Sequence, residues 1–230
     1  MHVIHPARED VDVDDLYGLA RPSLPGRPWV GVCMIASLDG TTVVDGRSGG
    51  LGNPTDTSVL GALRRAADVV LVGASTVRAE GYGPPKQPSL RIGVVTTRGV
   101  DTDTELFTCG AGFLVMPEDG PVLDSGVDVV RAGTGRVDLA VALRRLDAVM
   151  APPSFVQCEG GSQLNGALLA SGCVDELDLT ISPVLAGGDG PRVTSGAAPT
   201  FDRFDLAHLA TEDGYLYGRW VRRISPARPS

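Results

Sequence analysis

A glycine-rich turn between a predicted strand and a predicted helix carries the strongest chemical signal in the sequence. Residues 155–164 read Phe-Val-Gln-Cys-Glu-Gly-Gly-Ser-Gln-Leu. Glycines let the backbone approach an anion, and a helix N-terminus offers unpaired N–H groups and a partial positive charge. The pattern therefore predicts a cradle for the phosphates of a nucleotide. An ordinary tight turn remains the alternative, because the spacing is not G-x-G-x-x-G.

Glu159 places a carboxylate directly at this turn. Open α/β sheets bind their ligands outside the C-terminal ends of their strands, and Glu159 follows such an end. It is therefore a candidate catalytic and substrate-binding residue. The alternative is a carboxylate that only complements the dipole of the helix that follows.

Two other strand ends carry polar side chains of a similar kind. The segment Gly73-Ala-Ser75-Thr76 ends an apolar run and begins a helix, and Thr97-Arg98 ends another apolar run. Hydroxyl groups and an arginine at such a position can hold the 2′-phosphate that distinguishes NADPH from NADH. A solvated arginine in a loop is the alternative.

The segment Gly46-Arg-Ser48-Gly49-Gly50 matches the serine-hydrolase pattern G-x-S-x-G. That motif needs a helix directly after the serine. Here Gly49, Gly50, Gly52 and Pro54 follow, and no helix tolerates such a succession. The sequence therefore argues against a hydrolase, and we interpret Ser48 as a loop hydroxyl that faces a ligand.

The elements that position these residues alternate between strands and helices. Apolar runs and periodicity predict strands at 29–37, 68–73, 90–97, 112–116, 127–131, 155–158 and 174–181, and a hairpin of 204–211 with 215–224. Helices are expected at 55–67, with Thr55 as its cap, from 75, and at 137–146 and 162–171. This order is typical of a three-layer α/β fold whose central sheet is mostly parallel, with an antiparallel C-terminal hairpin. Residues 1–28 are proline-rich and polar, which indicates an N-terminal extension before a single domain at 29–224.

Composition and charge narrow the range of partners. The net charge of −8 argues against nucleic acid, and no apolar run approaches the ~18 residues of a membrane span. The N-terminus lacks the order of a signal peptide, so we expect a cytoplasmic protein. Three histidines and no C-x-x-C pair argue against a metal site. A small anionic metabolite remains a possible ligand if positive charge gathers locally.

An ordered set of segments resembles the reductase domain of the bifunctional riboflavin-biosynthesis deaminase/reductase. The matching pieces span roughly residues 30–222 and are 36–40 (Ala-Ser-Leu-Asp-Gly), Leu63-Arg64, 72–77 (Val-Gly-Ala-Ser-Thr-Val), 159–161 (Glu-Gly-Gly), 174–177 (Val-Asp-Glu-Leu) and 182–188 (Ser-Pro-Val-Leu-Ala-Gly-Gly). The resemblance implies a dihydrofolate-reductase-like fold. It also implies reduction of 5-amino-6-(5-phosphoribosylamino)uracil with NADPH. The deaminase half has no counterpart here, because no zinc signature of the H-x-E or C-x-x-C kind occurs.

The resemblance also implies roles for individual residues. It places Ala36, Thr76, Glu80 and residues 160–164 (Gly160, Gly161, Ser162, Gln163 and Leu164) around the cofactor, where Ser75, Thr97 and Arg98 would join them. It places Ser48, Arg64 and Glu159 against the substrate. Hydride would pass to C1 of the open-chain imine form of the substrate, and Glu80 or an ordered water would supply the proton.

One segment departs from the family. The family's usual Asp-Asp-Pro-x-Leu stretch, with an arginine three residues on, is replaced by Ala-Glu-Gly-Tyr-Gly-Pro-Pro-Lys at 79–86. Glu80 can replace a carboxylate, and Lys86, the chain's one lysine, is an approximate stand-in for the arginine that binds substrate phosphate.

Three functions therefore stay open at this level. They are the riboflavin-pathway reductase, a reductase of another pterin or pyrimidine such as dihydrofolate, and a nucleotide-binding protein without turnover. The apolar hairpin at 204–224 would form a sheet edge, which favours a homodimer.

Overall fold

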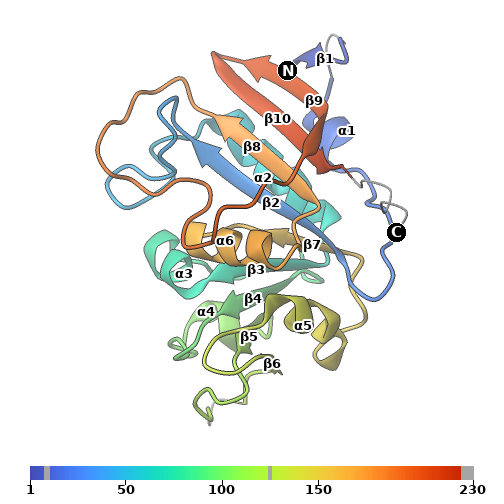
Figure 1. Cartoon of the computed structure of the whole chain (residues 1–230), viewed down its shortest axis with the longest axis vertical. Coiled ribbons are helices and arrows are strands. Elements are labelled where there is room, and N and C mark those ends of the chain that lie inside the picture. Colours follow the sequence, from blue (N-terminus) through green and yellow to red (C-terminus); the bar gives the residue numbers. More distant parts are fainter. Residues whose placement is uncertain (8–10, 124–125, 224–230) are drawn as a thin grey trace.

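Ten strands form one mixed sheet in the computed structural model, which describes residues 1–7, 11–123 and 126–223 (Figure 1). Across the sheet the order is β1-β9-β10-β8-β2-β7-β3-β4-β5-β6. The strands are β1 (His2–His5), β2 (Trp29–Ala36), β3 (Val69–Gly73), β4 (Arg91–Val95), β5 (Gly112–Met116), β6 (Val129–Arg131), β7 (Phe155–Cys158), β8 (Glu176–Ile181), β9 (Phe204–Glu212) and β10 (Tyr215–Arg222).

The sheet is parallel from β8 to β6 and antiparallel beyond β8. Strand β2 pairs in parallel with both β7 and β8, and β3, β4, β5 and β6 continue the parallel part. Strands β10, β9 and β1 each pair antiparallel with their neighbour. The predicted mostly parallel sheet with an antiparallel C-terminal hairpin is confirmed.

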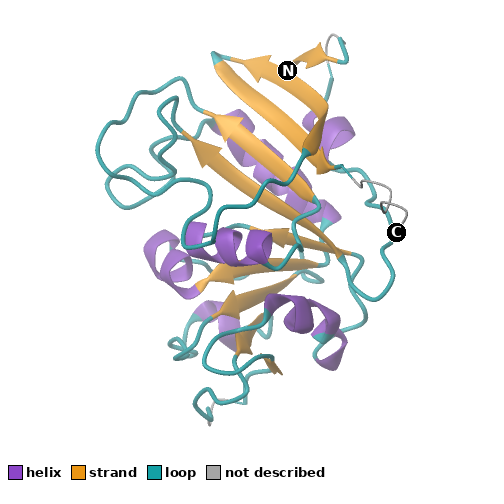
Figure 2. Ribbon diagram, in the orientation of Figure 1, coloured by secondary structure: helices purple, strands orange, loops and turns teal. Residues whose placement is uncertain are grey.

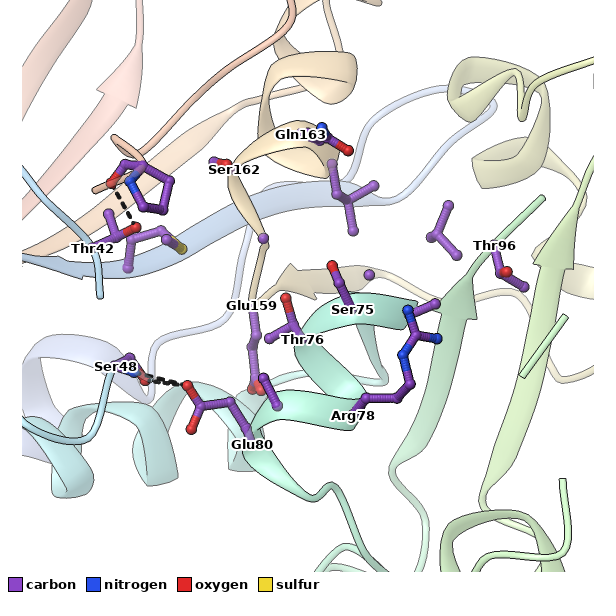
Figure 3. Close-up of a pocket in the computed structure, with 18 of the residues that line it drawn as sticks. Thr42, Ser48, Ser75, Thr76, Arg78, Glu80, Thr96, Glu159, Ser162 and Gln163 are labelled. Atoms are coloured by element: carbon purple, nitrogen blue, oxygen red, sulfur yellow. Dashed lines mark hydrogen bonds between the residues drawn. The ribbon is translucent and has the colours of Figure 1, made fainter. Parts of the chain in front are cut away.

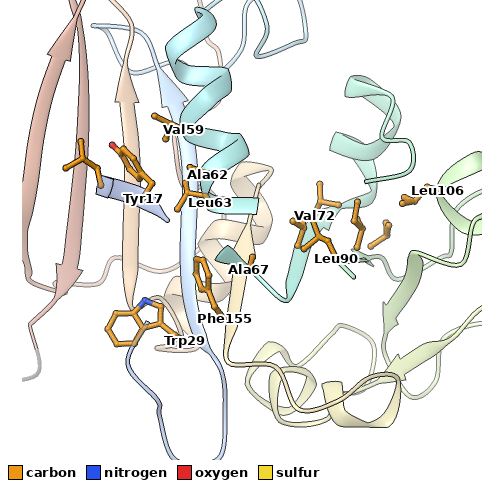
Figure 4. Packing of buried hydrophobic residues seen from close by; sticks show 14 of the residues in the cluster. Tyr17, Trp29, Val59, Ala62, Leu63, Ala67, Val72, Leu90, Leu106 and Phe155 are labelled. Atoms are coloured by element: carbon orange, nitrogen blue, oxygen red, sulfur yellow. The ribbon is translucent and has the colours of Figure 1, made fainter. Parts of the chain in front are cut away.

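Helices cover both faces of this sheet, which makes three layers (Figure 2). They are α1 (Val13–Tyr17), α2 (Pro54–Ala66), α3 (Ala74–Glu80), α4 (Glu105–Thr108), α5 (Leu139–Arg144) and α6 (Ser162–Ala170), with a short 3₁₀ turn at Leu146–Ala148. One apolar core packs α1, α2 and α4 against the sheet, with Tyr17, Leu63 and Phe155 among its members (Figure 4). A second core lies under α5 and α6 on the opposite face.

The N-terminal cap of helix α2 lies two residues earlier than the sequence indicates. Asn53 caps it, because the Asn53 side chain accepts a hydrogen bond from the Asp56 N–H at 2.8 Å. Pro54 then occupies the first helical position, where its missing N–H costs nothing. Thr55, the predicted cap, instead donates its hydroxyl hydrogen bond to Glu212.

The first 28 residues add two elements to the domain. Strand β1 pairs with β9 through Val3 and Ala210, so it covers part of the hairpin edge. In α1, Leu16 and Tyr17 are buried in the core. The polar composition of this segment gave no signal for either element. The predicted end of the last strand, Ile224, lies outside the described residues.

The fold sets the C-terminal ends of β2, β7, β3 and β4 side by side, because these strands are parallel neighbours. Each of the polar segments identified in the sequence follows one of these strands. The topology therefore gathers them at one edge of the sheet. No helix among the described residues is long and apolar enough to cross a membrane.

Candidate active site

A pocket of about 1160 Å³ opens where these strands end (Figure 3). Its walls come from β2, the loop at 42–48, the first turn of α2, helix α3, the loop after β4 and the β7–α6 turn. Figure 3 shows Thr42, Ser48 and Glu80 toward one end, Glu159, Ser75 and Thr76 in the middle, and Arg78 and Thr96 toward the other.

The glycine turn between β7 and α6 packs closely against the start of α3. Gly160 has a φ of +82°, which an L side chain rarely adopts, and the Gly160–Gly161 peptide is cis. The Gly73 N–H donates to the Gly160 carbonyl at 2.7 Å. A Cβ on Gly161 would lie 3.0 Å from Thr76 Oγ1, so a side chain here would require Thr76 to shift. Gly161 also provides no side-chain cap for α6, which leaves backbone N–H groups for an anion.

Three arginines line the end of the pocket beside β4. Arg98 follows β4, Arg78 lies in the last turn of α3, and Arg136 precedes α5. Within the described ranges of the chain, no ion pair engages any of their guanidinium groups. This end therefore carries unneutralised positive charge on a protein whose net charge is −8.

Sequence reasoning found Arg98 but missed the other two arginines. Arg78 follows Ser75 by three residues on a predicted helix, and residues three apart lie on one helical face. That spacing was a usable signal. Arg136 lies in a loop far along the chain, and only the fold brings it to the pocket.

Glu159 lies in the middle of the pocket and is held by three side chains. Arg64 donates from Nε to Oε1 at 2.7 Å and from Nη2 to Oε2 at 2.6 Å. The Tyr82 hydroxyl donates to Oε2 at 2.6 Å, and Gln157 donates to Oε1 at 3.1 Å. The carboxylate side chain is 4% exposed, so this two-pronged pair offsets the cost of burying its charge.

This network shifts the pKa values of Arg64 and Tyr82. The hydrogen bond from Arg64 to Glu159 raises the pKa of the Arg64 guanidinium above its already high value. Burial, followed by the charge of Glu159, raises the pKa of Tyr82 well above its usual value. Tyr82 is therefore a neutral hydrogen-bond donor at ordinary pH.

A second carboxylate joins α3 to the glycine-rich loop. The Ser48 N–H and hydroxyl donate to Glu80 Oε1 at 2.8 and 3.0 Å, as the dashed lines in Figure 3 mark. Glu80 thus holds the loop over the pocket.

The structure brings most of the predicted site residues together. Those that line the pocket are Ser48, Ser75, Thr76, Glu80, Thr97, Arg98, Glu159, Gly161, Ser162, Gln163 and Leu164. Ala36 and Gly160 are buried beside it, and Arg64 reaches it only through Glu159. Lys86 is exposed and does not line the pocket, so the structure does not bring it to the others. No group of three or more candidate metal ligands occurs in the described part of the chain.

The model of the RibD C-terminal domain family matches residues 28–214, which include every segment that builds the pocket. The chain belongs to this family. It is 28% identical over 206 residues to a 2,5-diamino-6-ribosylamino-4(3H)-pyrimidinone 5′-phosphate reductase of Methanothermobacter thermautotrophicus, and the match covers 84% of this chain and 94% of that relative.

Solved structures share the fold of this RibD-type chain. A pyrimidine reductase-like protein of Corynebacterium diphtheriae superposes with a TM-score of 0.80 at 23% identity, over 94% of this chain and all of its own. Dihydrofolate reductase of Enterococcus faecalis superposes with a TM-score of 0.53 at 14% identity, over 87% of this chain and 99% of its own. The predicted family and the dihydrofolate-reductase-like α/β fold are confirmed.

Proposed function

We propose that this protein is an NADPH-dependent reductase of a small pyrimidine-derived metabolite. The observation that carries the proposal is one pocket that contains both an uncapped glycine turn at a helix N-terminus and three arginines without an ion-pair partner among the described residues. A dinucleotide with an additional phosphate needs both features: N–H groups for its pyrophosphate and cations for its 2′-phosphate.

The residues present fit this cofactor. The close approach of Gly161 to Thr76 leaves backbone rather than side chain facing the pyrophosphate. Arg78, Arg98 and Arg136 would bind the 2′-phosphate. When bound, NADPH supplies a hydride, which is the demanding part of the chemistry.

The chain's own contribution is orientation of the reactants. Arg64 and Tyr82 fix Glu159 in the middle of the pocket, and Glu80 fixes the loop that carries Ser48. Such rigid positioning brings a hydride donor and an acceptor carbon together at little further entropic cost. Glu159 would accept hydrogen bonds from the substrate. Glu80 or a water molecule would supply the proton that the reduction requires.

The first candidate substrate is 5-amino-6-(5-phosphoribosylamino)uracil or its diaminopyrimidinone counterpart. The family and the Methanothermobacter relative support it. The role predicted for Lys86 in binding its phosphate stays a prediction.

Cofactor titration tests the proposal. Wild-type protein should bind NADPH much more tightly than NADH, and Arg98→Ala should weaken NADPH roughly ten- to a hundred-fold. This range corresponds to the loss of one charge-assisted hydrogen bond of about 1.5–3 kcal/mol. Arg47→Ala, which removes an exposed arginine outside the pocket lining, is the matched control and should change neither affinity. Equal affinity of the wild type for both cofactors would overturn the assignment.

A further inference from the structure

All the acceptor positions of the Glu159 carboxylate are occupied by donors of the protein itself. An ionised carboxylate offers about four lone pairs, two on each oxygen. Oε1 accepts hydrogen bonds from Arg64 Nε at 2.7 Å and from Gln157 Nε2 at 3.1 Å. Oε2 accepts from Arg64 Nη2 and from the Tyr82 hydroxyl, both at 2.6 Å. A substrate N–H therefore gains a full hydrogen bond to Glu159 only when one of these donors leaves.

Tyr82 is the donor that a ligand in the pocket meets at Glu159. Both Tyr82 and Glu159 line the pocket, and Glu159 lies in its middle (Figure 3). Arg64 and Gln157 do not line it. Gln157 is 1% exposed within β7, and Arg64 is held on α2 by two hydrogen bonds to Glu159. The Tyr82 hydroxyl is thus the one of these groups that a substrate can replace from the pocket.

The backbone around Tyr82 has freedom that the other two donors lack. Tyr82 follows α3 and lies between Gly81 and Gly83. Gly81 ends α3 in the left-handed region with a φ of 68°, and a Cβ at either glycine would meet no atom within 4 Å. Glycine backbone in open space rotates at low steric cost. Release of Tyr82 therefore requires no change in the helix or the strand that hold Arg64 and Gln157.

From these contacts we propose that Tyr82 is an internal competitor of the substrate. In the free protein its hydroxyl occupies the position on Glu159 Oε2 that an N–H donor of the substrate takes on binding. Arg64 and Gln157 keep the carboxylate in place during this exchange. The proposal rests on the proposed function, because it uses Glu159 as a group that binds the substrate.

The exchange has a definite energetic consequence. The apparent affinity for the substrate is lowered by the fraction of protein molecules in which the Oε2 position is free. A ligand that brings an N–H donor restores the fourth hydrogen bond of Glu159. A ligand without one leaves a buried acceptor unsatisfied once Tyr82 has moved, which is costly. Tyr82 thereby makes binding depend on a donor at this point of the substrate.

Tyr82→Phe tests the inference, because it removes the hydroxyl and keeps the ring that packs on the core and lies 5.5 Å from the Arg64 guanidinium. Wild type and variant, both loaded with NADP⁺, are titrated with 5-amino-6-(5-phosphoribosylamino)uracil in a calorimeter, and NADPH oxidation is followed separately. The variant should bind the compound about three- to ten-fold more tightly, since one competing hydrogen bond is lost. KM should fall by the same factor while kcat stays close to that of the wild type.

The sign of this change separates competition from a purely structural role. If Tyr82 only held Glu159 in place, loss of its hydroxyl would loosen the carboxylate and weaken substrate binding. Weaker or unchanged binding by Tyr82→Phe therefore overturns the inference and leaves the reductase function standing.

Tyr217→Phe is the matched control. The Tyr217 hydroxyl also donates to a side-chain oxygen, Asn53 Oδ1 at 3.0 Å, but Tyr217 does not line the pocket. This variant should bind the compound as the wild type does. An equal gain in both variants would mean that the release of Glu159 is not the cause, which overturns the inference.

The same titrations judge the proposed function separately. Tighter binding by Tyr82→Phe without NADPH oxidation in either protein supports the inference and counts against the reductase function on this compound. Binding by neither protein overturns the inference together with the pyrimidine substrate class, and titration with NADPH then shows whether the cofactor assignment survives.

Discussion

At the scale of single residues, Glu159 shows how far side-chain chemistry can be predicted from spacing. Its place after a strand and before two glycines predicted a carboxylate in the pocket, and the structure places it there. The side chains that hold Glu159 could not be predicted from the sequence. Arg64 was assigned to the substrate, yet it forms a two-pronged ion pair with Glu159, because α2 packs across the end of β7. A pair 95 residues apart in sequence leaves no local pattern.

Arg64→Met tests the structural weight of this pair. It leaves the Glu159 carboxylate buried without its cation, so the free energy of unfolding should fall by about 3 kcal/mol. Urea unfolding of the wild type and Arg64→Met measures this difference. The double variant Arg64→Met/Glu159→Gln should recover part of the lost stability, because it leaves no buried carboxylate without its cation. A single variant within about 0.5 kcal/mol of the wild type would contradict the role given to the pair.

At the scale of elements, the strands and helices that carry the site follow from local patterns, and their ends follow from capping. Strands β5 and β7 have the predicted bounds: β5 is a continuous apolar run, and β7 is interrupted only by Gln157 before the glycine turn ends it. The start of α2 was missed by two residues because Asn53 and Thr55 are both competent caps, and only the tertiary contact of Thr55 with Glu212 separates them. Strand β1 was missed because its pairing with β9 depends on a partner about 200 residues away.

The β7–α6 turn carries a prediction at this scale. Gly161→Val should remove measurable NADPH binding while the protein still folds, since the new side chain would press on Thr76 and fill the approach of the pyrophosphate. Calorimetric titration measures the affinity and circular dichroism checks the fold. Gly161→Ala, with a smaller side chain, should retain weak binding. If Gly161→Val binds NADPH as the wild type does, the cradle lies elsewhere.

At the scale of the whole molecule, the sheet order explains why the pocket has two different ends. The crossovers place β2 and β8 on one side of β7, and they place β3 and β4 on its other side. Residues as far apart in the sequence as Thr42 and Arg136 therefore line one pocket. The class of fold was predictable because strands and helices alternate. The gathering of Arg78, Arg98 and Arg136 beside β4 was not, since it depends on where the fold brings these residues together. The homodimer stays a prediction.

The antiparallel part of the sheet encloses a buried charged cluster with a definite pH dependence. Burial, followed by the charge of Arg219, lowers the pKa of His208 from 6.5 to about 4. The unfolded chain then binds this proton more readily, so stability falls as the pH drops from 6.5 towards 4, by up to about 3 kcal/mol.

Glu176 extends this loss to lower pH. Burial opposes its ionisation, but the hydrogen bonds and charges of Arg219 and Arg21 outweigh burial and hold its pKa at about 2. Its contribution is therefore lost between pH 4.5 and about 2. Urea unfolding at a series of pH values isolates the histidine by difference: relative to the wild type, His208→Gln should lose the fall in stability between pH 6.5 and 4. An unchanged slope in that variant would contradict the assignment.

Transfer of isotope from cofactor to product tests the proposed reductase function most directly. NADPH carrying deuterium at both positions of nicotinamide C4 is incubated with the protein and the candidate pyrimidine substrates, and the products are analysed by mass spectrometry. We expect one deuterium from the cofactor to appear on the reduced carbon of the product, at a rate that falls with Arg98→Ala. Tight NADPH binding without any transfer to these substrates would contradict the assignment of this protein as a reductase of pyrimidine metabolites.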